Sequence, residues 1–216
     1  MSVTASIQAR MGSSRLPGKV LLDLGGKRVI EHVVDRCRAA TTVDTVVLTT
    51  GHGDENDAIR EWCDRNDVRH ATGEEDDLLG RHLAVARGID CDLLVRITGD
   101  CPFLPPEEMD RLVRAHGDWD YTTNFTERMP VGTDIDVLTV DVLERLRRDG
   151  QRHPVKKLRA NPGDWDVETT ENEHLLSFPD VDIAVDSPAD YWRLTDATAA
   201  VGTEPMDVVE WLADRN

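Results

Sequence analysis

The sequence contains no apolar run approaching the roughly 20 residues that a membrane-spanning helix needs. Its first residues, Met1 to Thr4, also lack the basic start and apolar stretch of a secretory signal. We therefore expect a cytoplasmic protein with no membrane partner. At 216 residues the chain is long enough for one domain with a substantial core, and no repeat or low-complexity linker divides it. We treat residues 1–216 as a single domain.

Cysteine pairs are missing too. The four cysteines (Cys37, Cys63, Cys91 and Cys101) are scattered, and no C-x-x-C pair occurs. This spacing argues against a zinc ribbon or a disulfide scaffold and predicts reduced thiols. Cys37 and Cys63 fall in predicted helices, where we expect them to belong to the core.

Lysine is scarce, with four residues (Lys19, Lys27, Lys156 and Lys157), whereas 42 acidic residues outnumber 25 basic ones and give a net charge of −17. An acidic surface repels nucleic-acid backbones and anionic membranes, so we expect neither as a partner. The acids are spread along the chain, and arginine is favoured over lysine. This composition predicts a halophilic protein, because high salt screens the repulsion among the acids.

Apolar stretches alternate with helical patterns along the first half of the chain, which indicates an α/β fold with a mostly parallel sheet. We expect residues 150–166, which contain glycines and prolines, to form an excursion from the sheet. The patterns predict strands at 3–7, 43–49, 68–71, 93–97, 121–123, 135–139 and 182–185, and helices at 29–40, 54–66, 78–88, from 105, at 140–148 and twice after 188.

The segment that follows the first predicted strand is cationic and free of acid. Residues 7–19 contain three cations, two glycines and two serines. Glycine lets backbone N–H groups approach an anion, and arginine and lysine bind phosphate oxygens. A loop after the first strand of an α/β sheet is a usual place for phosphate. Residues 8–19 therefore predict a polyphosphate-binding loop, the alternative being a basic surface turn.

Two common phosphate loops do not match this segment. Five residues separate Gly12 from Gly18, and Val20 follows Lys19, whereas the Walker A pattern has four residues and then Ser or Thr after its lysine. The G-x-G-x-x-G spacing of dinucleotide-binding proteins is absent from the loop as well.

The run Q-A-R-M-G-S-S-R-L-P-G-K resembles the signature loop of the sugar-nucleotide cytidylyltransferases. It is most similar to the spore-coat polysaccharide branch, which is related to CMP-KDO synthetase and acylneuraminate cytidylyltransferase. The resemblance implies a Rossmann-like, nucleotide-diphospho-sugar transferase (GT-A-like) fold. Residues 1–120 would then bind the nucleotide, and residues 121–216 would serve the acceptor and a homodimer contact.

The same resemblance implies that CMP passes from CTP to an acidic or activated sugar, with pyrophosphate released. Arg10, Arg15 and Lys19 would be catalytic, since they would stabilise the phosphates and the leaving pyrophosphate. The implied nucleotide-binding residues are Gln8, Ala9, Arg10, Gly12, Ser13, Arg15, Lys19, Gly73 and Asp77, the last two from a Gly73-to-Arg81 stretch similar to the family's G-S-E-D-D-V-L-x-R. Without the family, that stretch is an acidic helix start.

Asp100 and Asp186 each follow an apolar run and precede a proline by one residue. At the carboxyl edge of a parallel sheet, both would face a bound polyphosphate, and a divalent cation would be needed between the like charges. The resemblance implies that the two bind Mg²⁺, the expected cofactor. Read alone, both segments are also ordinary helix caps.

Acceptor contacts are harder to assign. Gly132-Thr133-Asp134-Ile135-Asp136 resembles the family's G-x-D-V-E segment, so Asp134 or Asp136 would bind a sugar hydroxyl, although a loop-to-strand turn explains them almost as well. Residues 151–155 read Q-R-H-P-V where the branch has R-E-H-V-T, which places Arg152 where the glutamate would be. We expect this region to contact the acceptor or a partner subunit, and His153 to be structural.

Two other functions stay open from sequence. One is a nucleotidyltransferase of the same fold with a different nucleotide or a phosphorylated acceptor. The other is a sugar-nucleotide-binding relative that has lost turnover. The altered 151–155 segment allows this function, and the intact Arg10, Arg15, Lys19, Asp100 and Asp186 argue against it.

Overall fold

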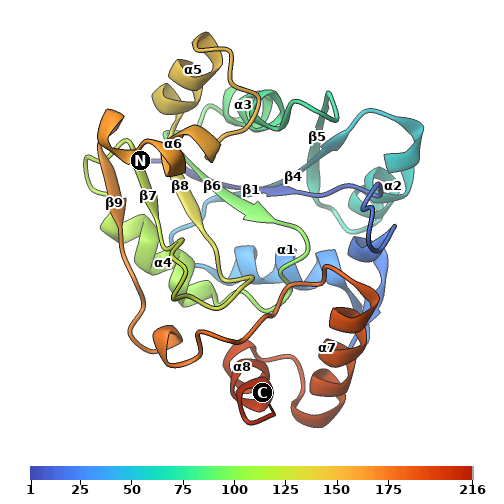
Figure 1. Cartoon of the computed structure of the whole chain (residues 1–216). Helices are drawn as coiled ribbons and strands as arrows, with labels where there is room; N and C mark the ends of the chain where they lie inside the picture. The colour runs from blue at the N-terminus through green and yellow to red at the C-terminus, as the bar shows by residue number, and fades with distance from the viewer. Residues whose placement is uncertain (216) are drawn as a thin grey trace.

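The computed structural model describes residues 1–215, and a seven-stranded sheet lies at its centre (Figure 1). The strand order is β5-β4-β1-β6-β8-β7-β9. Strand β8 is antiparallel to both of its neighbours, and the other pairings are parallel. The mostly parallel Rossmann-like sheet is therefore confirmed. The strands are β1 (Val3–Gln8), β4 (Thr45–Gly51), β5 (Arg69–Gly73), β6 (Leu93–Thr98), β7 (Tyr121–Thr123), β8 (Asp136–Thr139) and β9 (Val167–Thr169).

Helices cover both faces of the sheet (Figure 1). In β6, Leu94 packs into the cluster formed with α3 and α5, and Val95 packs into the cluster formed with α1 and α4. Burial on both faces explains why the strand is an uninterrupted apolar run. One layer consists of α1 (Val29–Ala39), α2 (Asp57–Arg65) and α4 (Pro106–Ala115), and the other of α3 (Leu78–Ile89) and α5 (Val140–Arg148).

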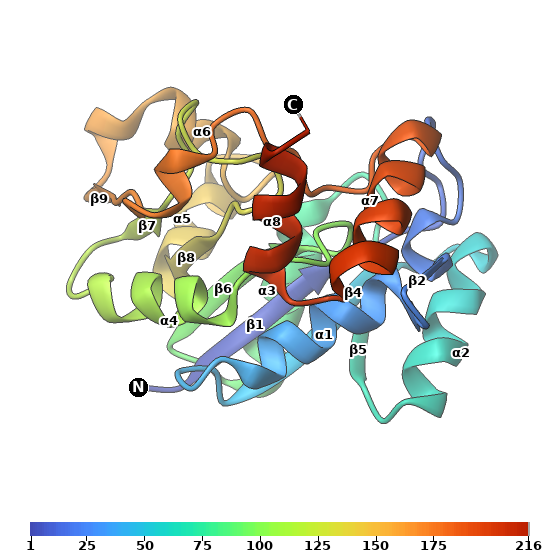
Figure 2. The ribbon, with the colours of Figure 1, turned by 90° about the horizontal axis from the view of Figure 1, so that it is seen from below.

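The last two helices, α7 (Pro188–Val201) and α8 (Pro205–Ala213), lie outside the layer that contains α1 (Figure 2). Leu194 and Val209 join a third apolar cluster that also holds Val29 at the start of α1. At the start of α7, Ser187 and Asp190 form a capping box, and Pro188 occupies the first helical position. The two predicted C-terminal helices are confirmed.

The predicted strand at 182–185 is wrong. Within the described residues, this segment makes one isolated bridge, between Asp182 and Val131. Its alternating apolar residues, Ile183 and Val185, are buried in the cluster with α7 and α8 rather than in the sheet. The Val185 N–H donates to the Asp100 carbonyl at 2.8 Å. This bond ties the two aspartate-bearing segments together at the sheet edge.

Other differences are local. Strand β9 and a small hairpin of β2 (Asp23–Leu24) and β3 (Lys27–Arg28) were not predicted from the sequence. The predicted excursion at 150–166 contains α6 (Lys156–Ala160). All four cysteines are buried and unpaired, as expected. Within residues 1–215, no helix is both long and apolar enough to cross a membrane. The short helices are η1 (Lys19–Leu21), η2 (Asp54–Asn56), η3 (Pro162–Asp164) and η4 (Leu175–Ser177).

The acidic composition leads to a prediction about salt. At a net charge of −17, repulsion among surface carboxylates opposes folding, and KCl screens it as the Debye length falls from about 10 Å at 0.1 M to about 3 Å at 1 M. We expect the Tm to rise by several degrees between these salt concentrations. Thermal unfolding followed by circular dichroism in a KCl series measures this. A Tm that does not change with KCl would contradict the predicted salt adaptation.

Candidate functional site

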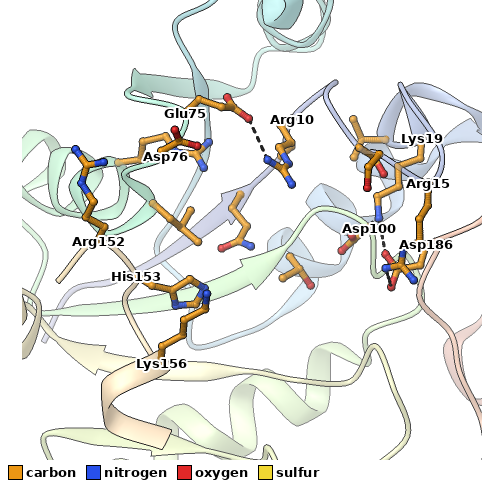
Figure 3. A pocket seen from close by; sticks show the side chains of 18 residues that line it. Arg10, Arg15, Lys19, Glu75, Asp76, Asp100, Arg152, His153, Lys156 and Asp186 are labelled. Atoms are coloured by element: carbon orange, nitrogen blue, oxygen red, sulfur yellow. Dashed lines mark hydrogen bonds and ion pairs between the residues drawn. The ribbon is translucent and has the colours of Figure 1, made fainter. Parts of the chain in front are cut away.

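A cavity of about 560 Å³ opens at the carboxyl edge of β1 and β6 (Figure 3). Five parts of the chain line it: the loop after β1, the start of α3, the end of β6, residues 152–156, and Asp186. Gly99 fits this edge because a Cβ there would lie 2.8 Å from the Gln8 carbonyl. The carboxyl edge of a parallel sheet is where α/β proteins bind ligands.

The loop after β1 is held in a closed conformation by its own backbone. The Met11 carbonyl accepts hydrogen bonds from the N–H groups of Ser13 and Gly18, at 3.0 and 2.9 Å. Asn56 accepts from the Met11 N–H at 2.9 Å and anchors the loop to the neighbouring helix layer. Gly18 has a φ of 73°, the left-handed region that glycine adopts without strain. The chain then turns into η1, and the Lys19 side chain points inward.

Lys19 lies between two carboxylates from distant parts of the chain (Figure 3). Its Nζ is 2.5 Å from Asp100 Oδ2 and 2.7 Å from Asp186 Oδ1, and its side chain is 9% exposed. Burial alone would lower the pKa of Lys19, but the two carboxylates outweigh it, so its pKa is raised. Burial likewise opposes ionisation of Asp186, and the contacts with Lys19 and Arg15 reverse this and lower its pKa. The sequence-predicted Asp100 and Asp186 therefore converge.

These carboxylates fit a magnesium ion that is bound together with a nucleotide. The described residues contain no group of three or more His, Cys, Asp or Glu side chains that could hold a metal. Mg²⁺, however, commonly uses one or two carboxylates and completes its shell with phosphate oxygens and water. Asp100 and Asp186 supply two carboxylates at one edge of a cavity that also contains Arg15. A cation between them would replace the Lys19 ammonium.

This geometry predicts competition between Lys19 and a divalent cation. In the Lys19→Met variant, Asp100 and Asp186 lose their shared ammonium, and we expect the nucleotide-free protein to bind Mn²⁺ at least about tenfold more tightly. Calorimetric titration with Mn²⁺ measures this affinity. Lys27→Met, which removes an exposed lysine paired with Asp35, serves as the control. Equal Mn²⁺ affinity in all three proteins would mean that the carboxylates do not form a metal site.

Arg10 and Arg81 line the cavity beside the start of α3. Arg10 is 3.5 Å from Glu75, and its side chain remains 56% exposed. Arg81 is 5% exposed, and its Nε and Nη1 have no hydrogen-bond partner among the described residues. Burial lowers its pKa, and Glu75 and Asp77 partly offset this. The side-chain stem of Arg81 packs so closely on Gly73 that a Cβ there would lie 2.7 Å from Arg81 Cγ. The two unsatisfied N–H groups of this buried guanidinium could donate to an anionic or carbonyl oxygen of a ligand.

We expect Arg81→Met to weaken nucleotide binding about 10- to 100-fold, the range for losing one or two charge-assisted hydrogen bonds. The Tm of this variant should equal or exceed that of the wild type, because an unpaired buried charge has been removed. Calorimetric titration with CTP and thermal unfolding separate the two effects. A lower Tm with unchanged CTP affinity would assign Arg81 to the fold alone.

Most of the predicted nucleotide-binding residues come together here, and some do not. Gln8, Ala9, Arg10, Ser13, Arg15 and Lys19 line the cavity, whereas Gly12 is exposed and, like Gly73, does not line it. Asp77 does not line the cavity either: it caps α3 by accepting from the Gly80 N–H at 3.0 Å, and it pairs with Arg147 at 2.5 Å. Glu75 and Asp76 line the cavity instead. Asp77 directly precedes the helix, so its carboxylate is committed to the helix N–H groups.

Asp136, predicted from the resemblance as an acceptor contact, does not line the cavity. Its side chain is fully buried outside the cavity lining, 2.6 Å from Arg96 and 2.8 Å from Arg159. Tyr121 and Thr123 donate to it as well. Burial would raise the pKa of Asp136, but the two arginines outweigh it and lower its pKa to about 2. Asp136 thus neutralises buried arginines. Asp134, 3.8 Å from Arg159, does not line the cavity either.

Several residues that line the cavity were not predicted from the sequence. Thr98 and Ser14 are close to predicted ones in sequence, and Arg81 ends the stretch compared with the family. His153, predicted to be structural, also lines the cavity, as do Arg152 and Lys156. The sequence signal for this segment was its departure from the family's R-E-H-V-T motif. A changed motif in a segment that contacts the ligand indicates changed ligand contacts.

Comparison with known proteins identifies the family of this chain. Residues 4–177 match the family described as Cytidylyltransferase. The spore coat polysaccharide biosynthesis protein SpsF of Bacillus subtilis is 29% identical over 209 residues, which cover 92% of this chain and 87% of that protein. A 3-deoxy-manno-octulosonate cytidylyltransferase of Geotalea uraniireducens is 27% identical over 86% of this chain and 75% of its own length.

Solved structures share the fold. A cytidylyltransferase from Leptospira borgpetersenii aligns with a TM-score of 0.90 and 27% identity, covering 100% of this chain and 95% of the other. A CMP:2-keto-3-deoxy-manno-octonic acid synthetase complexed with CTP aligns with a TM-score of 0.71 and 20% identity, over 92% of this chain and 99% of its own. The family match covers most of the chain and includes the loop, Lys19 and Asp100. The chain belongs to the cytidylyltransferase family.

Proposed function

We propose that this protein transfers CMP from CTP to a hydroxyl group of an acidic sugar and releases pyrophosphate, in the synthesis of a surface polysaccharide or glycan. The observation that carries the proposal is the convergence of Lys19 with Asp100 and Asp186 in one cavity, below the cationic loop. The named activities of the 3-deoxy-manno-octulosonate cytidylyltransferases support CTP and a sugar acid as substrates.

Positioning and charge are the main demands of this reaction. Arg10, Arg15 and Lys19 bind the β- and γ-phosphates and stabilise the charge that develops on the departing pyrophosphate. Asp100 and Asp186 would hold Mg²⁺, which neutralises the α-phosphate when bound. With Mg²⁺ on these carboxylates, the Lys19 ammonium would be available to contact the phosphates. Arg81 binds an oxygen of the nucleotide from the α3 side of the cavity.

A panel assay tests the proposal. Pyrophosphate release is followed with CTP, UTP, ATP and GTP against 3-deoxy-manno-octulosonate, N-acetylneuraminate, glucose 1-phosphate and glucose, in molar KCl with Mg²⁺. We expect CTP and a sugar acid to give the highest kcat/KM. Preference for another nucleotide or for the sugar phosphate would favour the related activity described above. Nucleotide binding without any turnover would favour a relative that has lost catalysis.

We also propose a homodimer and a cytoplasmic location, both supported by the resemblance to the family. Light scattering of the purified protein gives its mass in solution. A mass near 48 kDa would match two chains of 24.2 kDa.

A further inference from the structure

The wall formed by residues 152–156 carries three nitrogen donors that face the cavity and are not used by the rest of the protein. Among the described residues, the Arg152 and Lys156 side chains make no hydrogen bond or ion pair, and both are exposed to the cavity. His153 lies beside Lys156 (Figure 3). We propose that Arg152, His153 and Lys156 form the subsite for the anionic substituent of the acceptor, a carboxylate or a phosphate.

Backbone contacts anchor this segment to the rest of the protein. The Leu79 N–H at the start of α3 donates to the Arg152 carbonyl at 2.9 Å, which joins this segment to the opposite wall. Pro154 and Val155 are buried beneath it. The Val155 N–H donates to His153 Nδ1 at 3.3 Å, so the proton of a neutral ring sits on Nε2, which is a donor. Burial and the nearby cations lower the pKa of His153 to about 4, so the ring is neutral near pH 7.

The remaining charges of the cavity leave this wall as the place for a second anion. Arg15 and Lys19 are paired with Asp100 and Asp186, at the end assigned to the phosphates and the metal. Arg10 is paired with Glu75 on the α3 side. The lining contains six cations (Arg10, Arg15, Lys19, Arg81, Arg152 and Lys156) and four acids (Glu75, Asp76, Asp100 and Asp186), an excess of two positive charges in a protein of net charge −17. Such an excess attracts an anion beyond those that the pairs already balance.

Assigning this anion to the acceptor rests on the proposed function, whereas its binding can be measured directly. The test compares the wild type with Arg152→Gln, Lys156→Gln and the double variant. Arg148→Gln and Lys157→Gln are matched controls, because both residues lie on the same part of the chain but line a different cavity, beside Trp165. Calorimetric titrations use 3-deoxy-manno-octulosonate, glucose 1-phosphate and neutral glucose. EDTA is present to prevent turnover, CTP is included or omitted, and KCl is kept at the lowest concentration that maintains the fold.

We expect at least one of the two anions to bind the wild type saturably and at least tenfold more tightly than glucose, and the better of them identifies the substituent as carboxylate or phosphate. Each single variant should weaken that anion about tenfold or more, while the controls stay within twofold of the wild type. The CTP affinity should stay within twofold in all variants, because this wall does not bind the nucleotide. No saturable anion binding by the wild type, a parallel loss of CTP affinity, or equal losses in the controls would each overturn the proposal. If the panel assay gives no turnover but this binding pattern holds, the proposed function fails and the anion subsite stands.

Discussion

Replacing either Asp100 or Asp186 with asparagine is expected to slow magnesium-dependent pyrophosphate release by about 1,000-fold or more. The two carboxylates contact the same Lys19 ammonium, so they converge on one point of the cavity. Asparagine keeps the shape and one oxygen of each side chain but removes its charge. Stabilising transition-state charge through a bound metal supplies several kcal/mol, and about 1.4 kcal/mol corresponds to a factor of ten in rate. Turnover across a magnesium titration measures the effect.

Asp76→Asn is the matched control, because Asp76 is a carboxylate of the same cavity that does not contact Lys19. If all three variants lose activity to the same small degree, the aspartates only contribute to the potential of the cavity. Thermal unfolding must accompany the assay. Were Asp100→Asn and Asp186→Asn to melt early while their folded fraction turned over normally, both residues would be structural and the metal assignment would be wrong.

Asp136→Asn is expected to lower the free energy of unfolding by about 3–5 kcal/mol, the usual cost of leaving buried charges without their partner. In this variant Arg96, which is 7% exposed, loses the carboxylate with which it forms its ion pair. Arg159 loses the carboxylate that lies 2.8 Å away. For a chain of this size the loss corresponds to a decrease in Tm of roughly 10 °C. Asp134→Asn is the control: Asp134 is 3.8 Å from Arg159 and partly exposed, so we expect less than about 1 kcal/mol.

The same residue predicts part of the acid sensitivity of the fold. The pKa of Asp136 is about 2 in the folded protein and 3.8 as a model value, so the folded state favours the ionised carboxylate. Its contribution to stability is complete above about pH 4 and is lost as the pH falls toward 2. Asp136→Asn should therefore lack this portion of the acid-induced loss of stability. Denaturant unfolding between pH 5 and pH 2 compares the two proteins. An identical pH dependence would show that folding does not lower the pKa of this carboxylate.

The sequence predicted the first half of the fold well because its central strands β1, β4 and β6 are largely buried and each crossover helix has its own apolar stripe. The run from Leu93 to Ile97 is of this kind. In the second half, short alternating segments were ambiguous. Ile183 and Val185 alternate as a strand would, but their burial partners are α7 and α8. An alternating pattern indicates that every second residue is buried, but it does not identify the element against which those residues pack.

The candidate site shows the same limit. The loop around Lys19 was predicted from its composition and its position after the first strand. Asp100 and Asp186 were predicted because each follows the end of an apolar segment. All three residues line the cavity. Arg81 and Lys156 reach the cavity from helices, by side-chain direction alone. Asp77 and Asp136 were assigned to ligands although their partners are Arg147, Arg96 and Arg159. These pairs span 23 to 70 positions of sequence, and nothing in the local pattern marks them.

The position of Arg96 limits how such enzymes can be recombined. Its side chain donates to Gln8 of the cavity at 3.0 Å and to Asp136 of β8 at 2.6 Å, so one buried cation links both halves of the sheet. A chimera joined at residue 120, built to exchange acceptor specificity between relatives, would take its arginine from one parent and its carboxylate from the other. A donor that lacks an acid at the first position of β8 would leave that arginine buried without its carboxylate partner. A stable chimera should therefore take Arg96, Asp136 and Arg159 from the same parent.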